Sequence, residues 1–189
     1  ATLLGYTQQE LEHYFADYLD RLVQTFHIPR HELLQQIAFW YDGYSWDGVN
    51  RVYVPFSTLV FLEQQIFANH WFSTATPTFL VKLLRKQQIP AYEVEELSAD
   101  SKLLDSADVA AINVYSLLFQ TGYLTIKSTW LGPTGQNYDL GYPNYEVAQA
   151  FRHHLLADYL GGRFEQMSTS ILNRLQNALR SQNVEGFIN

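Results

Sequence analysis

The segment from Ser116 to Phe151 places the strongest constraint on what this chain can fold into. An apolar helical stretch within it ends at Gly122, and two extended runs follow, Tyr123 to Ile126 and Tyr138 to Leu140. Tyr142-Pro143-Asn144 then leads into another helix, which Asn144 is expected to cap. The order helix, hairpin, helix predicts a winged-helix-like unit in an otherwise helical chain. Such a unit usually positions or couples other parts of a protein.

Helical patterns dominate the residues before this unit. Thr7-Gln8-Gln9-Glu10 is a capping box, and apolar residues recur at helical spacing from there to about Phe26. A second helix ends near Trp40, where Asp42-Gly43 is expected to supply a left-handed cap. An extended Val52-Tyr53-Val54 precedes Pro55, which suits the first turn of a third helix that reaches Phe67.

Composition excludes several classes of function. The net charge is −7, from 12 basic and 19 acidic residues, and the basic residues are scattered along the chain. Because phosphate binding depends on clustered Lys and Arg, we do not expect this chain to bind nucleic acid by itself. Cysteine is absent, which excludes disulfides and thiolate metal sites. No apolar run is long enough to span a membrane and no signal peptide is evident, so a cytoplasmic location is expected.

Motifs for catalysis are missing or incomplete. The chain has no Walker loop, no Gly-x-Gly-x-x-Gly and no Gly-x-Ser-x-Gly. Asp100-Ser101-Lys102 matches the end of a restriction-type nuclease motif, but Glu95 to Ala99 does not read as the strand that such a site needs, so we expect a solvated loop. The helix after Asn144 carries His153 and His154, with Asp158 one turn further on. These three residues could hold a metal, but a polar helix face explains them more simply.

The densest polar and aromatic cluster is Trp40-Tyr41-Asp42-Gly43-Tyr44. Side chains at a helix end can converge on a ligand. A structural role is the stronger interpretation, with the aromatic rings packed, Gly43 at positive φ, and Asp42 bonded to nearby backbone amides.

Six segments of the chain form a recognisable set: Leu4 to Thr7 with Glu10-Leu11, Trp40 to Tyr44, Val52 to Ser57, Trp71 to Thr74, Leu117 to Ile126 and Tyr142 to Val147. Together they resemble one bacterial family, the AAA-ATPase-like proteins that carry a C-terminal PD-(D/E)XK nuclease-like domain. They occur in the family's order, and the resemblance covers nearly the whole chain. The chain departs from the family pattern at Val54, where members usually carry Asn, so the following helix is expected to start slightly differently.

The resemblance implies a mainly α fold, with a helical lid-like bundle followed by the winged-helix-like unit and its one β-hairpin. The expected divisions are a lid-like subdomain at 1–88, a connection at 89–106, the winged-helix-like unit at 107–162, and a helical start of a linker at 163–189. The Walker loop would lie before Ala1 and the nuclease carboxylates after Asn189. The chain would then be an excised, non-catalytic fragment, which agrees with its abrupt ends and failed motifs.

In related ATPases the lid rests over the nucleotide. The resemblance therefore makes Asp42, Gly43, Tyr44 and Arg51 the candidates for residues near a bound nucleotide. Arg51 is the only basic residue near that turn, and a lid arginine could stabilise phosphate charge during hydrolysis. ATP and Mg²⁺ are expected for the parent protein, whereas the fragment itself is expected to hold no cofactor, metal or catalytic residue.

Three functional hypotheses remain open. In the first, the chain couples the nucleotide state of the ATPase core to the nuclease-like domain of the same polypeptide. In the second, its acidic and aromatic surface docks a protein partner or a second copy, with no role for nucleic acid. The third and weakest is an autonomous metal-dependent hydrolase built on His153, His154 and Asp158. A DNA-reading wing should carry Lys and Arg, yet only Lys127 lies on the ribbon.

Overall fold

The computed structural model describes residues 5–71, 78–89, 94, 97–100, 113–133, 135–160, 171, 173 and 174. Helices predominate in these ranges, but two small antiparallel sheets make the architecture mixed. Within the described residues, no helix combines the length and the apolar character that crossing a membrane requires. In chain order the elements are α1 (Gln8–Tyr14), α2 (Ala16–Phe26), α3 (Arg30–Tyr41), β1 (Asp42–Tyr44), β2 (Val52–Tyr53), α4 (Pro55–Gln64), α5 (Thr78–Lys86), β3 (Leu97–Asp100), α7 (Val114–Gln120), β4 (Thr125–Gly132), β5 (Gly135–Gly141) and α8 (Tyr145–Leu160).

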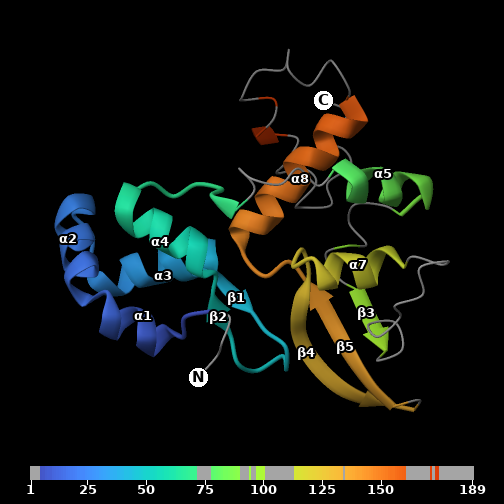
Figure 1. Ribbon diagram of the computed structural model, residues 1–189, viewed down its shortest axis with the longest axis horizontal. Helices are drawn as coiled ribbons and strands as arrows, with labels where there is room; N and C mark the ends of the chain where they lie inside the picture. The colour runs from blue at the N-terminus through green and yellow to red at the C-terminus, as the bar shows by residue number, and fades with distance from the viewer. Residues whose placement is uncertain are drawn as a thin grey trace.

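Two apolar cores organise these elements, and they lie on opposite sides of Figure 1. The first core is formed by α1 to α4 with the β1–β2 pair, and the second by α5, α7, α8 and the three-stranded sheet. The division between the cores thus falls between α4 and α5, so α5 packs with the second core although it precedes residue 88. The first core contains Leu11, Leu19, Leu22, Leu33, Ile37, Tyr41, Tyr53, Phe61 and Leu62.

The capping box at Thr7 is confirmed. Thr7 Oγ1 accepts a hydrogen bond from Glu10 N at 3.2 Å, and the Glu10 carboxylate accepts one from Thr7 N at 2.9 Å. The single helix predicted as far as Phe26 is wrong, because Phe15 leaves helical geometry at φ −115° and ψ 24°. Its ring packs edge-on against Tyr6 at 5.3 Å, and this tertiary contact competes with the helical pattern that sequence periodicity detects.

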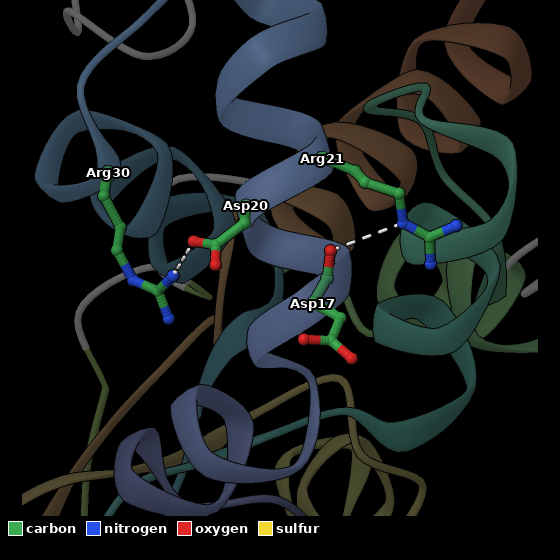
Figure 2. A network of polar contacts seen from close by, with 4 residues as sticks. All are labelled: Asp17, Asp20, Arg21 and Arg30. Carbon is green, nitrogen blue, oxygen red and sulfur yellow. Dashed lines mark hydrogen bonds and ion pairs between the residues drawn. The ribbon is translucent and has the colours of Figure 1, made fainter.

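One ion pair links α2 to the start of α3 at the surface, and a second polar contact lies within α2 (Figure 2). Arg30 forms an ion pair with Asp20, and Arg21 Nε donates to the backbone oxygen of Asp17 at 3.3 Å. An exposed ion pair of this kind contributes at most about 1 kcal/mol. The pairing of α2 with α3 therefore depends mainly on buried apolar side chains, namely Leu19, Leu22, Leu33 and Ile37.

Helix α4 begins as the sequence predicts. Pro55 occupies the first turn, and the preceding Val54 is extended and makes no side-chain cap. The helix ends earlier than predicted, since Gln65 adopts a left-handed conformation at φ 59°. Phe67 therefore lies beyond the helix, but its ring stacks on Phe61 with centroids 4.2 Å apart, so its apolar character still serves the first core.

The three-stranded sheet has the order β3-β5-β4 and is larger than the predicted hairpin. The stretch from Trp130 to Gln136 is dense in turn-forming residues and is predicted from sequence to be a loop, but most of it is strand, because β4 extends to Gly132 and β5 begins at Gly135. The prediction that Asp100 lies in a solvated loop is also wrong, because it ends β3. The ribbon of β4 and β5 projects from the rest of the protein in Figure 1. Its outer half is exposed, and its apolar residues Trp130 and Leu131 are adjacent, so this part of the sequence lacks the alternation of apolar and polar residues that marks a strand.

Asp139 in the middle strand fixes this polar part of the sheet. It lies opposite Ser98 of β3 and Ser128 of β4. Both serine hydroxyls donate to its carboxylate, at 2.8 and 2.5 Å, and Trp130 Nε1 donates at 3.1 Å. These hydrogen bonds, that from Ser128 first, hold the pKa of Asp139 below its ordinary value. One carboxylate therefore joins all three strands.

Asparagine caps start the two helices that flank the ribbon. Asn144 Oδ1 accepts from Val147 N at 3.1 Å, which confirms the predicted cap of α8. Asn113 is extended, and its side chain accepts from Tyr115 N, so α7 begins later than the predicted start near Ala107. The sequence also predicts a helix start at Thr76-Pro77, a helix end at Gly161-Gly162 and a last helix that carries Ile171, Leu172, Leu175 and Leu179. The first two, residues 107–112 and most of the last helix lie outside the described residues.

Helix α4 offers a matched pair of variants for testing the first core. Phe61 is fully buried, whereas Phe56 on the same helix is 50% exposed. Phe61→Ala should lower the free energy of unfolding by about 3–5 kcal/mol, because it removes buried surface and leaves a cavity. Phe56→Ala should cost far less. Urea unfolding followed by circular dichroism measures both, and equal losses would contradict this description of the core.

Candidate functional site

The two cores meet where β1 and the loop after it lie against the start of β4 and the turn before α8. We call these contacts the joint. It consists of residues 42–45, 57, 70 and 71, which precede α5, residues 122 and 125–127 of the α7–β4 region, and residues 143–146 at the start of α8. Most of its contacts are polar and join residues more than 70 positions apart. The joint is therefore the structure's long-range connection between its two halves.

Gly43 makes the closest approach in the joint. Its φ is 127°, and a Cβ on this residue would lie only 2.0 Å from the backbone oxygen of Pro143. The left-handed helix cap predicted here is wrong, because Asp42 is extended at φ −90° and ψ 157° and the chain passes from α3 directly into β1. Positive φ at Gly43 was predicted correctly, but close backbone approach is a further reason for glycine.

The next two residues of β1 and its loop bond to the β4 side. Tyr44 donates its hydroxyl to the backbone oxygen of Gly122 at 2.9 Å, and burial raises its pKa. Ser45 N donates to Thr125 Oγ1 at 2.7 Å, and the Thr125 hydroxyl donates back to Ser45 O at 2.8 Å. Ile126 N also donates to Ser45 O, at 3.3 Å. These hydrogen bonds join the loop after β1 to the first residues of β4.

Glu146 in the first turn of α8 makes the most deeply buried contact of the joint. Its side chain is fully buried, and its Oε1 accepts three hydrogen bonds from the first core's side. The donors are Ser57 Oγ of α4 at 2.8 Å, His70 N at 2.7 Å and Trp71 N at 2.8 Å. A single oxygen atom thereby ties α8 to two separate segments.

Aromatic rings surround these polar contacts. Tyr145 stacks on Phe39 with centroids 4.7 Å apart and meets Trp40 edge-on at 4.7 Å. The His70 ring lies 6.1 Å from the Tyr41 ring, as predicted for a core contact. Such rings exclude water, which strengthens the hydrogen bonds beside them. The structural interpretation of the Trp40 to Tyr44 cluster thus accounts for what each of its residues contacts.

Lys127 joins the candidate residues Asp42 and Arg51, and sequence analysis did not connect it with them. Its Nζ donates to the backbone oxygen of Pro143 at 3.1 Å. Burial, with a further contribution from Arg51, lowers the pKa of Lys127 to about 8, whereas Asp42 opposes this. Burial raises the pKa of Asp42, and Arg51 and Lys127 partly offset the rise. No local pattern could have found this residue, since it lies 76 positions after Arg51 in the sequence.

Arg51 is exposed, although its charge acts on Asp42. It lines a surface cavity of about 430 Å³. Asp47 in this cavity is already engaged, because it accepts hydrogen bonds from Val49 N and Asn50 N at 2.8 and 2.7 Å. The structure thus brings Asp42, Gly43 and Tyr44 into the joint and leaves Arg51 open to solvent. The cavity is lined by Thr7, Glu10, Trp46, Asp47, Asn50, Arg51 and Val52.

The histidine pair on α8 does not form a recognisable metal site with the other residues that the structure describes. The rings of His153 and His154 lie 5.9 Å apart, and burial lowers both pKa values. Asp158, the proposed third ligand, pairs instead with Arg85 at 3.4 Å. Among the residues that the structure describes, no group of three or more His, Asp or Glu side chains is arranged to hold a metal ion.

Two glycines with similar backbone conformations allow the Gly43 contact to be tested. Gly135 has φ 125°, and a Cβ added to it would meet nothing within 4 Å, whereas at Gly43, with φ 127°, it would meet Pro143. Gly135→Ala should cost only the backbone strain of about 1–3 kcal/mol. Gly43→Ala should cost about 4 kcal/mol or more, because the joint must also move apart. Urea unfolding of both variants tests this, and equal losses would contradict a tight contact at Pro143.

The charge cluster predicts opposite shifts for two variants. Arg51→Gln should raise the pKa of Lys127 from about 8, and Asp42→Asn should lower it, because each removes one charge that acts on the ammonium group. Since folding lowers this pKa from 10.5, Lys127 destabilises the fold at low pH, and the penalty is lost as pH rises through the interval between the two values. The NMR titration of Lys127 Cε measures these shifts. Arg21→Gln on α2, remote from the ribbon in Figure 1, is the control and should leave the midpoint unchanged.

Comparison with known proteins identifies a curated relative over most of this chain. The chain is 36% identical over 160 residues to a protein of Azotobacter chroococcum mcd 1 named "Uncharacterized protein in vnfD 5'region". The alignment covers 85% of this chain but only 29% of that protein, so the chain spans less than a third of the relative's length. No family model matches the chain. No solved structure matches it either.

Proposed function

We propose that this chain is the coupling part of an AAA-ATPase-like protein with a nuclease-like domain. In this proposal the helices of the first core form the lid of the ATPase, and the second core, with its winged-helix-like ribbon, leads to the nuclease-like effector. The chain performs no chemistry itself. Movement of the lid on binding ATP reaches the effector through the joint.

The convergence of the resembling segments on the joint is the observation that carries this proposal. Gly43 and Tyr44 contact the segments that contain Pro143 and Gly122. Ser57 and Trp71, from two more segments, donate to Glu146. Residues that are far apart in sequence but characteristic of the family therefore meet at one place. Such an arrangement is expected if the function that family members share is coupling between two halves of the protein and not catalysis at one site.

The nucleotide belongs to the ATPase core, and Arg51 is the residue of this chain that we propose to face it. Its guanidinium is exposed beside a cavity that also contains the Trp46 ring. An arginine so placed could bind a phosphate group once the core is present. The charge of Arg51 acts on Asp42 and Lys127 and lowers the pKa of both. Binding of ATP and Mg²⁺ at Arg51 would thus alter the electrostatic balance of the joint directly.

Direct binding of DNA by the ribbon has no support in the charge distribution. Lys127 is the ribbon's only basic residue, and it is turned inward to Pro143. The end of the ribbon instead exposes Trp130 and Leu131, the latter to 85%. These two residues favour the second candidate function, in which the chain docks a protein partner or a second copy.

Fluorescence energy transfer in the longer, flanking protein tests the coupling proposal. The chain has no cysteine, so single cysteines at the exposed Glu63 of α4 or Thr129 of β4 can be labelled in turn, with the second dye in the ATPase core. A non-hydrolysable ATP analogue should shift the energy transfer at both sites. The double variant Tyr44→Phe, Thr125→Val removes joint hydrogen bonds, so it should keep the shift at Glu63 and reduce that at Thr129. Tyr159→Phe, at an exposed tyrosine of α8, is the control.

Each result separates the hypotheses. A longer protein that binds no nucleotide would contradict the resemblance itself. A shift at Glu63 without one at Thr129 in the unaltered protein would contradict coupling. Tight binding of the chain to duplex DNA at physiological salt would overturn our preference for protein contacts.

A further inference from the structure

The carboxylate of Glu146 carries its hydrogen bonds unevenly. Oε1 accepts all three donors, from Ser57, His70 and Trp71. Oε2 is also buried, but it has no hydrogen-bond partner among the residues that the structure describes. An ionised carboxylate spreads its charge over both oxygens, so this arrangement leaves half of the charge without compensation in a buried site.

We propose that Glu146 holds a proton on Oε2 while the joint is closed, so that closing the joint takes up one proton and opening it releases one. A protonated Oε2 carries no net charge into the interior. Oε1 remains a carbonyl oxygen and still accepts the three hydrogen bonds. The proposal concerns the joint alone, so it stands whether or not the ATPase resemblance is correct.

The charged and titratable groups that act on Glu146 are consistent with a neutral side chain. Tyr41 of α3 and Tyr44 of β1 both interact with its charge, and burial raises the pKa of each, that of Tyr41 to about 12. Both hydroxyls therefore stay neutral over the range in which a carboxyl titrates. His70 is the one group among the three that can carry a positive charge, and it favours the ionised form of Glu146.

Burial is the largest effect on Glu146, and it raises the pKa above the ordinary value. The donors Trp71, Ser57 and His70 oppose the rise but do not cancel it. The closed joint thus binds the proton more tightly than the open one. Its proton-linked stability is fully present below the ordinary pKa of a glutamate and is lost as pH rises through the raised value. In that window the opening equilibrium changes by up to about tenfold per pH unit, since one proton is involved.

Amide hydrogen exchange at His70 and Trp71 tests the proposal, because both amides donate to Oε1. Protection factors, corrected for the intrinsic effect of pH, should fall in the unaltered chain as pH rises above the ordinary pKa of a glutamate, by up to about tenfold per unit. Glu146→Gln keeps an acceptor oxygen and a neutral charge, so its protection factors should be high and independent of pH. The ¹³C shift of Glu146 Cδ should also titrate at a higher pH than that of the exposed Glu63 on α4.

Two further variants separate this effect from others. Glu63→Gln should leave the pH dependence unchanged. His70→Gln keeps the backbone amide, so it should keep the pH dependence but move it to higher pH, because His70 favours the ionised form of Glu146. The proposal is overturned if Glu146→Gln loses protection at every pH, since the donors would then require a charged oxygen. It is likewise overturned if His70→Gln abolishes the pH dependence, or if Glu146 Cδ titrates together with Glu63 Cδ.

Discussion

The fold depends on three hydrogen bonds that meet at one oxygen atom, Oε1 of Glu146. Their donors come from α4 and from the segment after it, whereas the acceptor begins α8. Other contacts between the two apolar cores include the hydrogen bonds of Tyr44 and Ser45, the close approach of Gly43 to Pro143 and the aromatic contacts of Tyr145. Buried hydrogen bonds to a carboxyl group are directional, so they set the angle between the cores in a way that apolar packing does not. The orientation of the ribbon relative to α1–α4 follows from this contact.

Gly43 adds the second constraint, since its backbone approaches Pro143 more closely than any side chain would allow. Lys127 binds the same carbonyl oxygen, and its ammonium group comes under the influence of Asp42 and Arg51. A hydrogen-bonded carbonyl, a closely packed glycine and a buried cation therefore share one point of the structure. A ligand that altered the charge near Arg51 would change the pKa of Lys127. Through Lys127 it would affect the hydrogen bond to the Pro143 oxygen. Coupling through the joint would depend on these contacts among Arg51, Lys127 and Pro143.

Local signals predicted much of the fold, and long-range contacts account for what they missed. The Thr7 capping box, Pro55 in the first turn of α4 and the Asn144 cap are each set by neighbours within four residues, so the sequence shows them directly. The break at Phe15 arises from a ring contact with Tyr6 that helical periodicity does not encode. The outer ribbon lacks the alternation by which strands are recognised. In the site, Asp42 to Tyr44 were found from composition, whereas Lys127 and Glu146 became visible only when distant segments met.

The carboxylate of Asp139 has a consequence for how the ribbon finds its partners. In the outer half of the ribbon most residues of β4 are exposed, so little burial prevents one strand from sliding past another there. Here a slide by one residue would turn Asp139 to the opposite face and break its bonds to Ser98, Ser128 and Trp130 together. A single polar side chain thus fixes the strand register of a projecting ribbon whose outer half buries too little apolar surface to fix it.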